Sequence, residues 1–191
     1  MGASLSAILT KISQPKILLL LLILALPLIV WVFPWRRSQL VSLTGLTNPT
    51  FDVRFAYSSQ DLLQALPSYG SEARYLYAIS EVTLDFIFPL LYTAFLIGIM
   101  AWLYRSAFPA NSALHKLIYV PFGVLLADLL ENISLTGLLL AYPPALIPLV
   151  RAASVFSLTK WLLSALVILF IFAGLLSFLF TWMQEKTRNR N

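Results

Sequence analysis

The stretch VPFGVLLADLLENISLTGLLLAYPP, residues 120–144, is long and apolar enough to cross a lipid bilayer, yet its centre carries two acids and an amide. A membrane-spanning helix needs about 20 predominantly apolar residues. Asp128, Glu131 and Asn132 lie at positions i, i+3 and i+4, so a helix places all three on one face. Charged side chains within membrane spans almost always face the protein interior. The stretch therefore predicts a membrane helix whose polar face contacts other helices.

The composition of the whole chain supports the same class of protein. Of its 191 residues, 60% are hydrophobic and 11% are charged, and the mean hydropathy is +0.85. Because soluble domains carry about 25% charged residues, the chain is predicted to be one membrane domain, residues 1–191. The net charge of +5 is typical of basic ends that face anionic lipid. We expect the lipid bilayer, and no nucleic acid, as a partner.

Three further apolar stretches are long enough to span a membrane. The four predicted spans are residues 17–35, 79–104, 117–142 and 154–183. Tyrosines and tryptophans lie near their ends, as they do at the two interfaces of a bilayer. The sequence therefore predicts an all-α integral membrane protein built as a four-transmembrane-helix bundle, with its oligomeric state left open.

Four spans place both termini on the same side of the membrane. The basic residues assigned to that side are Lys11, Lys16, Arg105, Lys116, Lys186, Arg188 and Arg190. Those assigned to the opposite side are Arg36, Arg37, Arg54, Arg74, Arg151 and Lys160. The short terminal flanks favour cytoplasmic N- and C-termini, although the adjacent Arg36 and Arg37 oppose this orientation.

Residues 36–78, between the first two spans, are predicted to form one ordered extramembrane loop. Ser58 and Asp61 have the spacing of a helix capping box, and Pro67 with Gly70 ends that short helix. A second helix, capped by Ser71, is expected to run unbroken into the second span. The loop is therefore interpreted as a small lid, with an ordinary connector as the alternative.

Polar residues also align on the second and fourth predicted spans. Arg74, Glu81, Asp85 and Tyr92 are separated by intervals of 7, 4 and 7 residues, which nearly complete whole helical turns. Lys160 lies early in the fourth span. At 1.5 Å per residue, these groups reach the same half of the membrane as the acids of the third span. The predicted polar pocket consists of Asp85, Asp128, Glu131 and Asn132, with Lys160, Glu81, Tyr92 and Arg74 as further members.

The energetic cost of buried charge restricts the state of this pocket. An ionised side chain at the bilayer centre costs about 2.5–3.5 kcal/mol on insertion scales. The acids are therefore expected to be protonated, to pair with basic groups, or to bind a cation. Asp85, Asp128 and Glu131 are the candidate ligands of a divalent metal, which prefers oxygen atoms. The simpler alternatives are hydrogen bonds that join helices, and a Lys160 that reaches the interface.

Several kinds of site are disfavoured by the composition. The chain has no cysteine and a single histidine, His115, so neither a thiolate metal site nor a bis-histidine haem is expected. It also lacks the HExxH, GxSxG, Walker A and GxGxxG motifs. No catalytic residue and no cofactor can be named from the sequence.

Three functions are compatible with this pattern. The first is a protein that binds or transports a cation, a proton or a polar or lipid headgroup in its acidic pocket. The second is a membrane-embedded enzyme that acts on a lipid-like substrate through carboxylates, with or without a divalent metal. The third is a structural or assembly subunit of a membrane complex. An open channel is disfavoured because the other halves of the helices are uniformly apolar.

Overall fold

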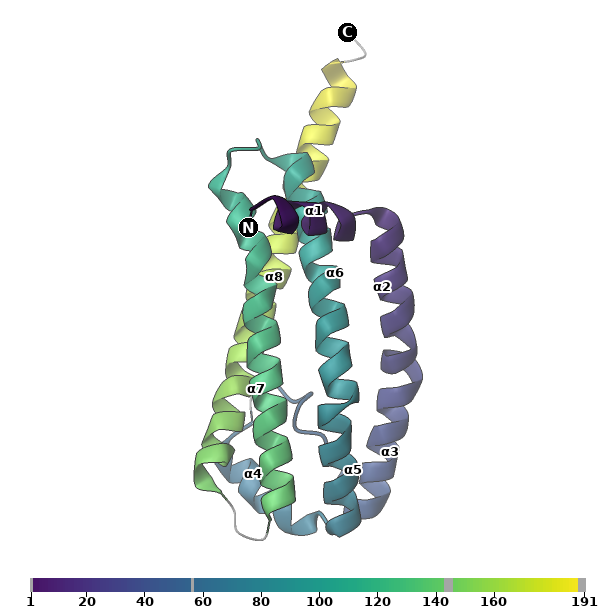
Figure 1. The fold of residues 1–191 in the computed structure, drawn as a ribbon, viewed down its shortest axis with the longest axis vertical. Coiled ribbons are helices and arrows are strands. Elements are labelled where there is room, and N and C mark those ends of the chain that lie inside the picture. The colour runs from purple at the N-terminus through teal and green to yellow at the C-terminus, as the bar shows by residue number, and fades with distance from the viewer. Residues whose placement is uncertain (1, 56, 143–145, 189–191) are drawn as a thin grey trace.

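The computed structural model describes residues 2–55, 57–142 and 146–188 and forms a bundle of long, roughly parallel helical rods (Figure 1). No strand occurs in these ranges. Four helical segments are long and apolar enough to cross a membrane: 15–44, 71–107, 113–141 and 147–184. The prediction of an all-helical chain with four such segments is confirmed, and each segment is longer than the span predicted at its position.

The first rod continues well beyond the predicted end at residue 35. A short helix, α1 (Gly2–Ile12), crosses one end of the bundle and leads into α2 (Pro15–Pro27), the π-helical turn η1 (Leu28–Val32) and α3 (Phe33–Thr44) (Figure 1). Prolines 27 and 34 lack a backbone N–H, and the wider π turn between them keeps the rod continuous. Gly45, at a φ of 69°, ends α3 in the left-handed conformation.

The segment that joins the first two rods folds into the bundle. Thr50, Phe51 and Asp52 are 1%, 1% and 6% exposed, so this stretch of the predicted loop, residues 36–78, packs against the rods. The hydroxyl of Tyr77 accepts a hydrogen bond from the Phe51 amide at 2.6 Å, which fixes the main chain at this point. The helix α4 (Ser59–Ala65) follows with the predicted capping box of Ser58, and the short η2 (Leu66–Ser68) ends it.

The second rod consists of two helices, α5 (Ser71–Val82) and α6 (Leu84–Ala107), where one unbroken helix was expected. The break lies at Thr83, whose hydroxyl donates to the Ile79 carbonyl at 2.6 Å while its amide bonds Ser80 at 3.3 Å. A side chain that takes a carbonyl of the preceding turn competes with the regular ladder. The break lies two residues before Asp85.

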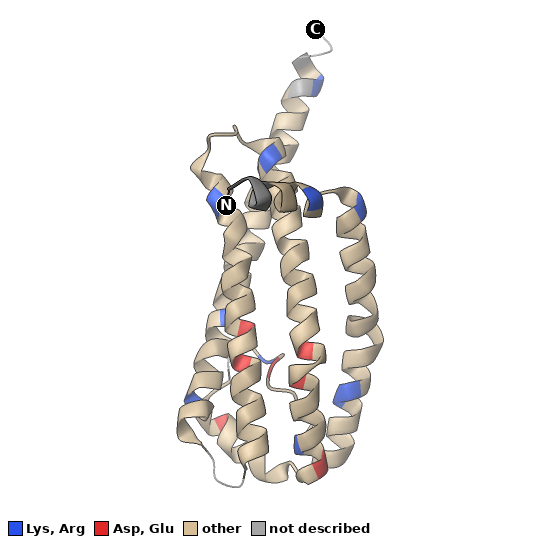
Figure 2. Ribbon diagram, viewed as in Figure 1, with Lys and Arg blue, Asp and Glu red and all other residues tan. Residues whose placement is uncertain are grey.

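The last two rods pack closely against each other. The short η3 (Ala113–Tyr119) leads into α7 (Val120–Ala141), and α8 (Ile147–Arg188) extends past the end of the bundle where α1 and both termini lie (Figure 1). Basic residues occur at that end and also in the other half, whereas the residues coloured as acidic in Figure 2 all lie away from that end. Arg190, one of the basic residues counted in the C-terminal flank, lies outside the described residues.

Two apolar clusters enclose a polar layer. One cluster is built around Leu62, Tyr69, Tyr77, Leu138 and Val150. The other is built around Ile97, Met100, Tyr104, Val124 and Val167. On the second rod (α5 and α6), on α7 and on α8, the buried charged residues lie between the two clusters, so each of these rods passes from apolar to polar to apolar surroundings. The bundle therefore holds its charged groups at one defined depth.

Candidate functional site: a paired-charge layer beside an apolar cavity

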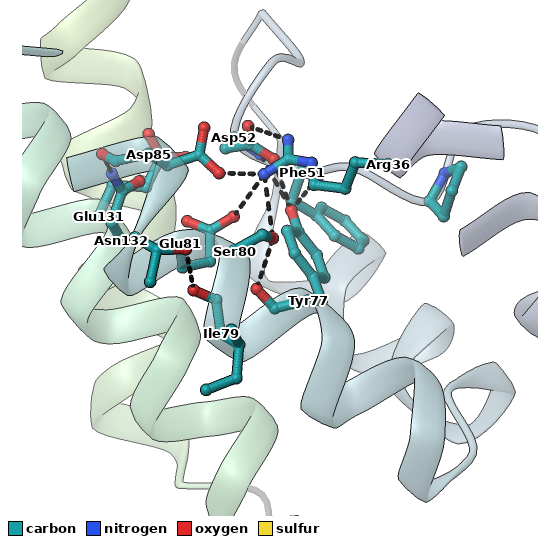
Figure 3. Close-up of polar contacts among 12 residues, drawn as sticks. Arg36, Phe51, Asp52, Tyr77, Ile79, Ser80, Glu81, Asp85, Glu131 and Asn132 are labelled. Carbon is teal, nitrogen blue, oxygen red and sulfur yellow. Dashed lines mark hydrogen bonds and ion pairs between the residues drawn. The ribbon is translucent and has the colours of Figure 1, made fainter. Parts of the chain in front are cut away.

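Arg36 is the centre of one half of the polar layer. Its side chain is 2% exposed and points from α3 toward α5 and α6 (Figure 3). The Nη1 atom bonds the Asp85 carboxylate, donates to Ser80 Oγ at 3.2 Å, and lies 3.8 Å from Glu81 Oε1. The Nη2 atom donates to Asp52 Oδ2 at 3.0 Å. One guanidinium therefore faces three carboxyl groups, which come from three different elements of the chain.

Lys160 is the centre of the other half. Its Nζ atom lies 2.6 Å from Glu131 Oε2, 3.2 Å from Asp128 Oδ1 and 2.7 Å from the main-chain carbonyl of Asp52. The Asp128 and Asp52 oxygens accept hydrogen bonds from the ammonium, and Glu131 forms an ion pair with it. Lys160 is 7% exposed, which rules out the alternative that it extends to the interface.

Asp52 joins the two halves, because its carboxylate faces Arg36 and its carbonyl faces Lys160. The Tyr77 hydroxyl donates a further hydrogen bond to Asp52 Oδ1 at 2.7 Å. Burial acts to raise the pKa of this carboxyl, but the Arg36 and Lys160 cations and the Tyr77 hydrogen bond outweigh burial and lower the pKa below its ordinary value. Asp52 is therefore the ionised link of the layer.

Two hydrogen bonds attach α7 to α6. The Asn132 side-chain amide donates to the Asp85 carbonyl at 2.6 Å, and the Tyr92 hydroxyl donates to Asp128 Oδ2 at 2.6 Å. Asp85 has a free carbonyl because Pro89, four residues later, has no N–H to donate to it. The proline thus creates the acceptor that Asn132 uses, and the backbone group is satisfied from a neighbouring helix.

The structure brings together all but one of the residues predicted for the pocket. Arg74 is the exception, since its Nη1 donates to the Tyr69 carbonyl at 2.5 Å and its guanidinium lies over the Tyr142 ring. Arg74 precedes Glu81 by two helical turns, which is a rise of about 10 Å along the axis. The helical spacing correctly placed Arg74 on the same face as Glu81, but Arg74 lies too far along the helix axis to reach the pocket.

Three residues of the layer were missed by sequence reasoning. Arg36 was assigned to the loop because the apolar run ends at residue 35, and Asp52 was assigned to the same loop. Tyr77 was treated as an interfacial aromatic. The one local signal for Asp52 is its position between Phe51 and Val53, where an acid interrupts an apolar segment.

The predicted trio of metal ligands is divided between two protein cations. Asp85 pairs with Arg36, whereas Asp128 and Glu131 pair with Lys160. Among the described residues, the carboxylates that converge within 4.8 Å are those of Asp52, Glu81 and Asp85, and Arg36 already lies among them. A divalent metal at either position would have to displace a buried cation of the protein.

A cavity of about 670 Å³ lies against this layer. Arg36, Asp52, Asp85, Asp128 and Lys160 form its polar end. The rest of its wall is apolar and aromatic, and includes Phe33, Phe88, Phe95, Trp161, Val167 and Ile168. Ile29 of η1 and Ile168 of α8 line the cavity and are 48% and 52% exposed, so the cavity opens to the surroundings between these two rods.

A second cavity of about 310 Å³ lies between α2 and α6 and is lined by Leu18, Leu22, Ile99 and Trp102. Phe95 is part of the wall of both cavities.

Comparison of the chain with known protein families, with curated proteins and with solved structures found no match.

Proposed function

We propose that this chain is a multi-pass membrane protein that binds an amphiphile, with the headgroup at the charged layer and the apolar part in the cavity. The observation that carries the proposal is the cavity itself, which is charged at one end, apolar elsewhere and open at mid-height of the rods. Small-molecule pockets have volumes of about 300–1,000 Å³, are mostly apolar, and orient the ligand through a few polar groups. The cavity has these properties.

The arrangement of charges supports binding more than internal stabilisation alone. A layer that served only to join helices would be enclosed on all sides by packed side chains. Here Asp85 and Asp128 also form part of a cavity wall, while their hydrogen bonds to Arg36 and Tyr92 hold them in fixed positions. Fixed polar groups beside an empty volume are typical of a preorganised site.

The charge pairing also supports cytoplasmic termini. Arg36 and Lys160 are paired inside the bundle, so they do not act as free charges of the loops opposite the termini. When Arg36 and Lys160 are left out of the count of basic residues on the two sides of the membrane, the excess on the side of the termini becomes larger. A cysteine in place of Gln60 should react with an impermeant thiol reagent in intact cells, and one in place of Gln184 should not. The opposite labelling would reverse the orientation.

Binding can be tested with a long-chain alcohol that carries a photoactivatable diazirine in its alkyl chain. Irradiation of the purified protein in a neutral maltoside detergent should attach the probe to residues 85–96 and 160–168. Ser164 lines the cavity and Ala165 faces away from it, so Ser164→Phe should abolish this labelling and Ala165→Phe should not. Labelling confined to lipid-facing residues such as Leu169 and Leu176, equal in both variants, would refute the proposal.

A further inference from the structure

We infer that the headgroup the cavity accepts is a cation, namely an alkylammonium, and this inference rests on the proposed function. The observation behind it is that the layer presents an unpaired carboxylate oxygen to the cavity while its own buried cations are already paired. The ligand class is thus a hydrophobic amine, or a lipid with an ammonium headgroup.

Both buried cations are already paired with carboxylates, and the Arg36 Nε, which has no hydrogen-bond partner among the described residues, is fully buried. Lys160 donates hydrogen bonds to Asp128 Oδ1 and to the Asp52 carbonyl, and it forms an ion pair with Glu131 at 2.6 Å. Both Nη atoms of Arg36 are engaged by carboxylates, Nη1 by Asp85 and Nη2 by Asp52. An anion that took the place of one of these carboxylates would break a buried ion pair, and separating such a pair is strongly destabilising.

Acceptor capacity remains on the acidic side. The layer contains five carboxyl groups and two cations: Asp52, Glu81, Asp85, Asp128 and Glu131 against Arg36 and Lys160. Only one oxygen of Asp85 is directed at Arg36 (Figure 3), and Oδ1 forms no hydrogen bond within the described part of the chain. Asp85 is 7% exposed and lines the cavity, so this oxygen is available to a ligand there.

Aromatic rings beside the carboxylates suit the same headgroup. Phe88, Tyr92 and Trp161 line the cavity near its charged end, and the rings of Phe88 and Tyr92 meet edge to face at 5.4 Å. Ring faces attract cations, and aromatic walls are the usual surroundings of bound ammonium groups. An alkylammonium would therefore find an anionic acceptor, ring faces and an apolar channel for its chain in one place.

Arg37 lines the cavity without an ion pair among the described residues, so it favours an anion there. It lines the cavity, its guanidinium donates to the Thr47 carbonyl at 3.2 Å, and it is exposed. The charge of an exposed group is screened by its surroundings, so its effect on a bound headgroup is smaller than that of buried Asp85. Arg37→Gln is therefore a necessary comparison in any test of headgroup charge.

The test compares dodecylammonium, dodecanol and dodecanoate, which share one alkyl chain and differ in headgroup charge. Affinities are measured by native mass spectrometry and by thermal stabilisation of the whole chain in neutral maltoside detergent. Dodecylammonium should bind about tenfold more tightly than dodecanol, the advantage expected of a charged hydrogen bond. Dodecanoate should bind more weakly than dodecanol.

Variants separate this inference from the proposed function. Asp85→Asn keeps the size of the side chain and should reduce the preference for dodecylammonium over dodecanol to about twofold or less, whereas Glu72→Gln, at an exposed acid outside the cavity, should retain it. If Asp85→Asn does not fold, Phe88→Leu, which removes an aromatic ring beside the charged end of the cavity, should reduce the same preference. A two-chain lipid with the same ammonium headgroup shows which kind of molecule supplies the headgroup. Binding of this lipid indicates a membrane lipid, whereas binding of the single-chain amine alone indicates a smaller amphiphile.

Two outcomes would overturn the inference. One of them leaves the proposed amphiphile binding in place, and the other refutes it as well. Equal binding of the three probes, or a preference for dodecanoate that Arg37→Gln abolishes, would refute the cationic headgroup and leave amphiphile binding intact. No binding of any probe, with Ser164→Phe indistinguishable from wild type, would refute both the inference and the proposed function.

Discussion

The ammonium of Lys160 on α8 donates a hydrogen bond to the main-chain carbonyl of Asp52 at 2.7 Å, although 108 residues separate the two in the chain. The same Asp52 gives its carboxylate to Arg36 at 3.0 Å. The segment between the first two rods is thereby held in the bundle by one cation on each side. The two ion-pair groups are thus parts of one network, and each should depend on the other.

Loss of the Lys160 cation should destabilise the bundle strongly. Lys160→Met leaves the buried carboxylates of Asp128 and Glu131 without their cation, at an expected loss of about 3–5 kcal/mol in the free energy of unfolding. Adding Glu131→Gln to this variant should recover part of the loss. Thermal unfolding in detergent is the measurement, and Lys186→Met, at an exposed position on the same helix, is the control. A Lys160→Met protein as stable as the control would disprove the pairing.

Adjacent arginines provide a second matched comparison. Arg36 is buried among carboxyl groups and Arg37 is exposed, so Arg36→Gln should lower the free energy of unfolding by about 3–5 kcal/mol and Arg37→Gln should leave it nearly unchanged. Arg36→Lys should restore only part of the stability, because one ammonium cannot bridge Asp52, Ser80 and Asp85 as a guanidinium does. Equal effects at both positions would show that α3 does not face the layer as described.

The low pKa of Asp52 makes its contribution to stability dependent on pH. A carboxyl whose pKa is lower in the folded than in the unfolded protein stabilises the fold at pH above its ordinary value of 3.8. That contribution disappears as the pH falls through the pKa of the folded state. The stability difference between wild type and Asp52→Asn should therefore be constant near neutral pH and shrink as the pH falls below about 4. Chemical unfolding of both proteins from pH 7 to pH 3 measures it, and a difference that grows on acidification would contradict the assignment.

The side chain of Phe95 should limit the length of the bound chain, because Phe95 lines both the 670 Å³ cavity and the 310 Å³ cavity. Phe95→Ala should join the two volumes and raise the affinity of hexadecylammonium relative to dodecylammonium. Phe86→Ala, at an exposed position on the same helix, should leave the ratio unchanged. Native mass spectrometry with both amines measures the ratio of their affinities. An unchanged ratio in Phe95→Ala would show that the two cavities do not become one continuous volume.

The sequence alone determined the all-helical class of the fold, with four long apolar helices, and most members of the polar layer. Four apolar helices follow from hydropathy, which is a local property that a window of about 20 residues reveals. The common depth of Asp85, Asp128, Glu131 and Lys160 follows from helical rise and periodicity, which are equally local. The free carbonyl of Asp85 is also readable in the sequence, from the proline four residues later.

Tertiary structure alone decided how those charges are paired. Arg36 meets Asp52 and Asp85 at separations of 16 and 49 residues, and no local pattern records such contacts. Arg36 faces the bundle because the first rod continues past the end of its apolar run, through a π turn that hydropathy does not reveal. Asp52 enters the bundle because two cations and Tyr77 together offset the cost of burying it. Such compensation exists only once all four rods are assembled, so the sequence could place the acids but could not identify their partners.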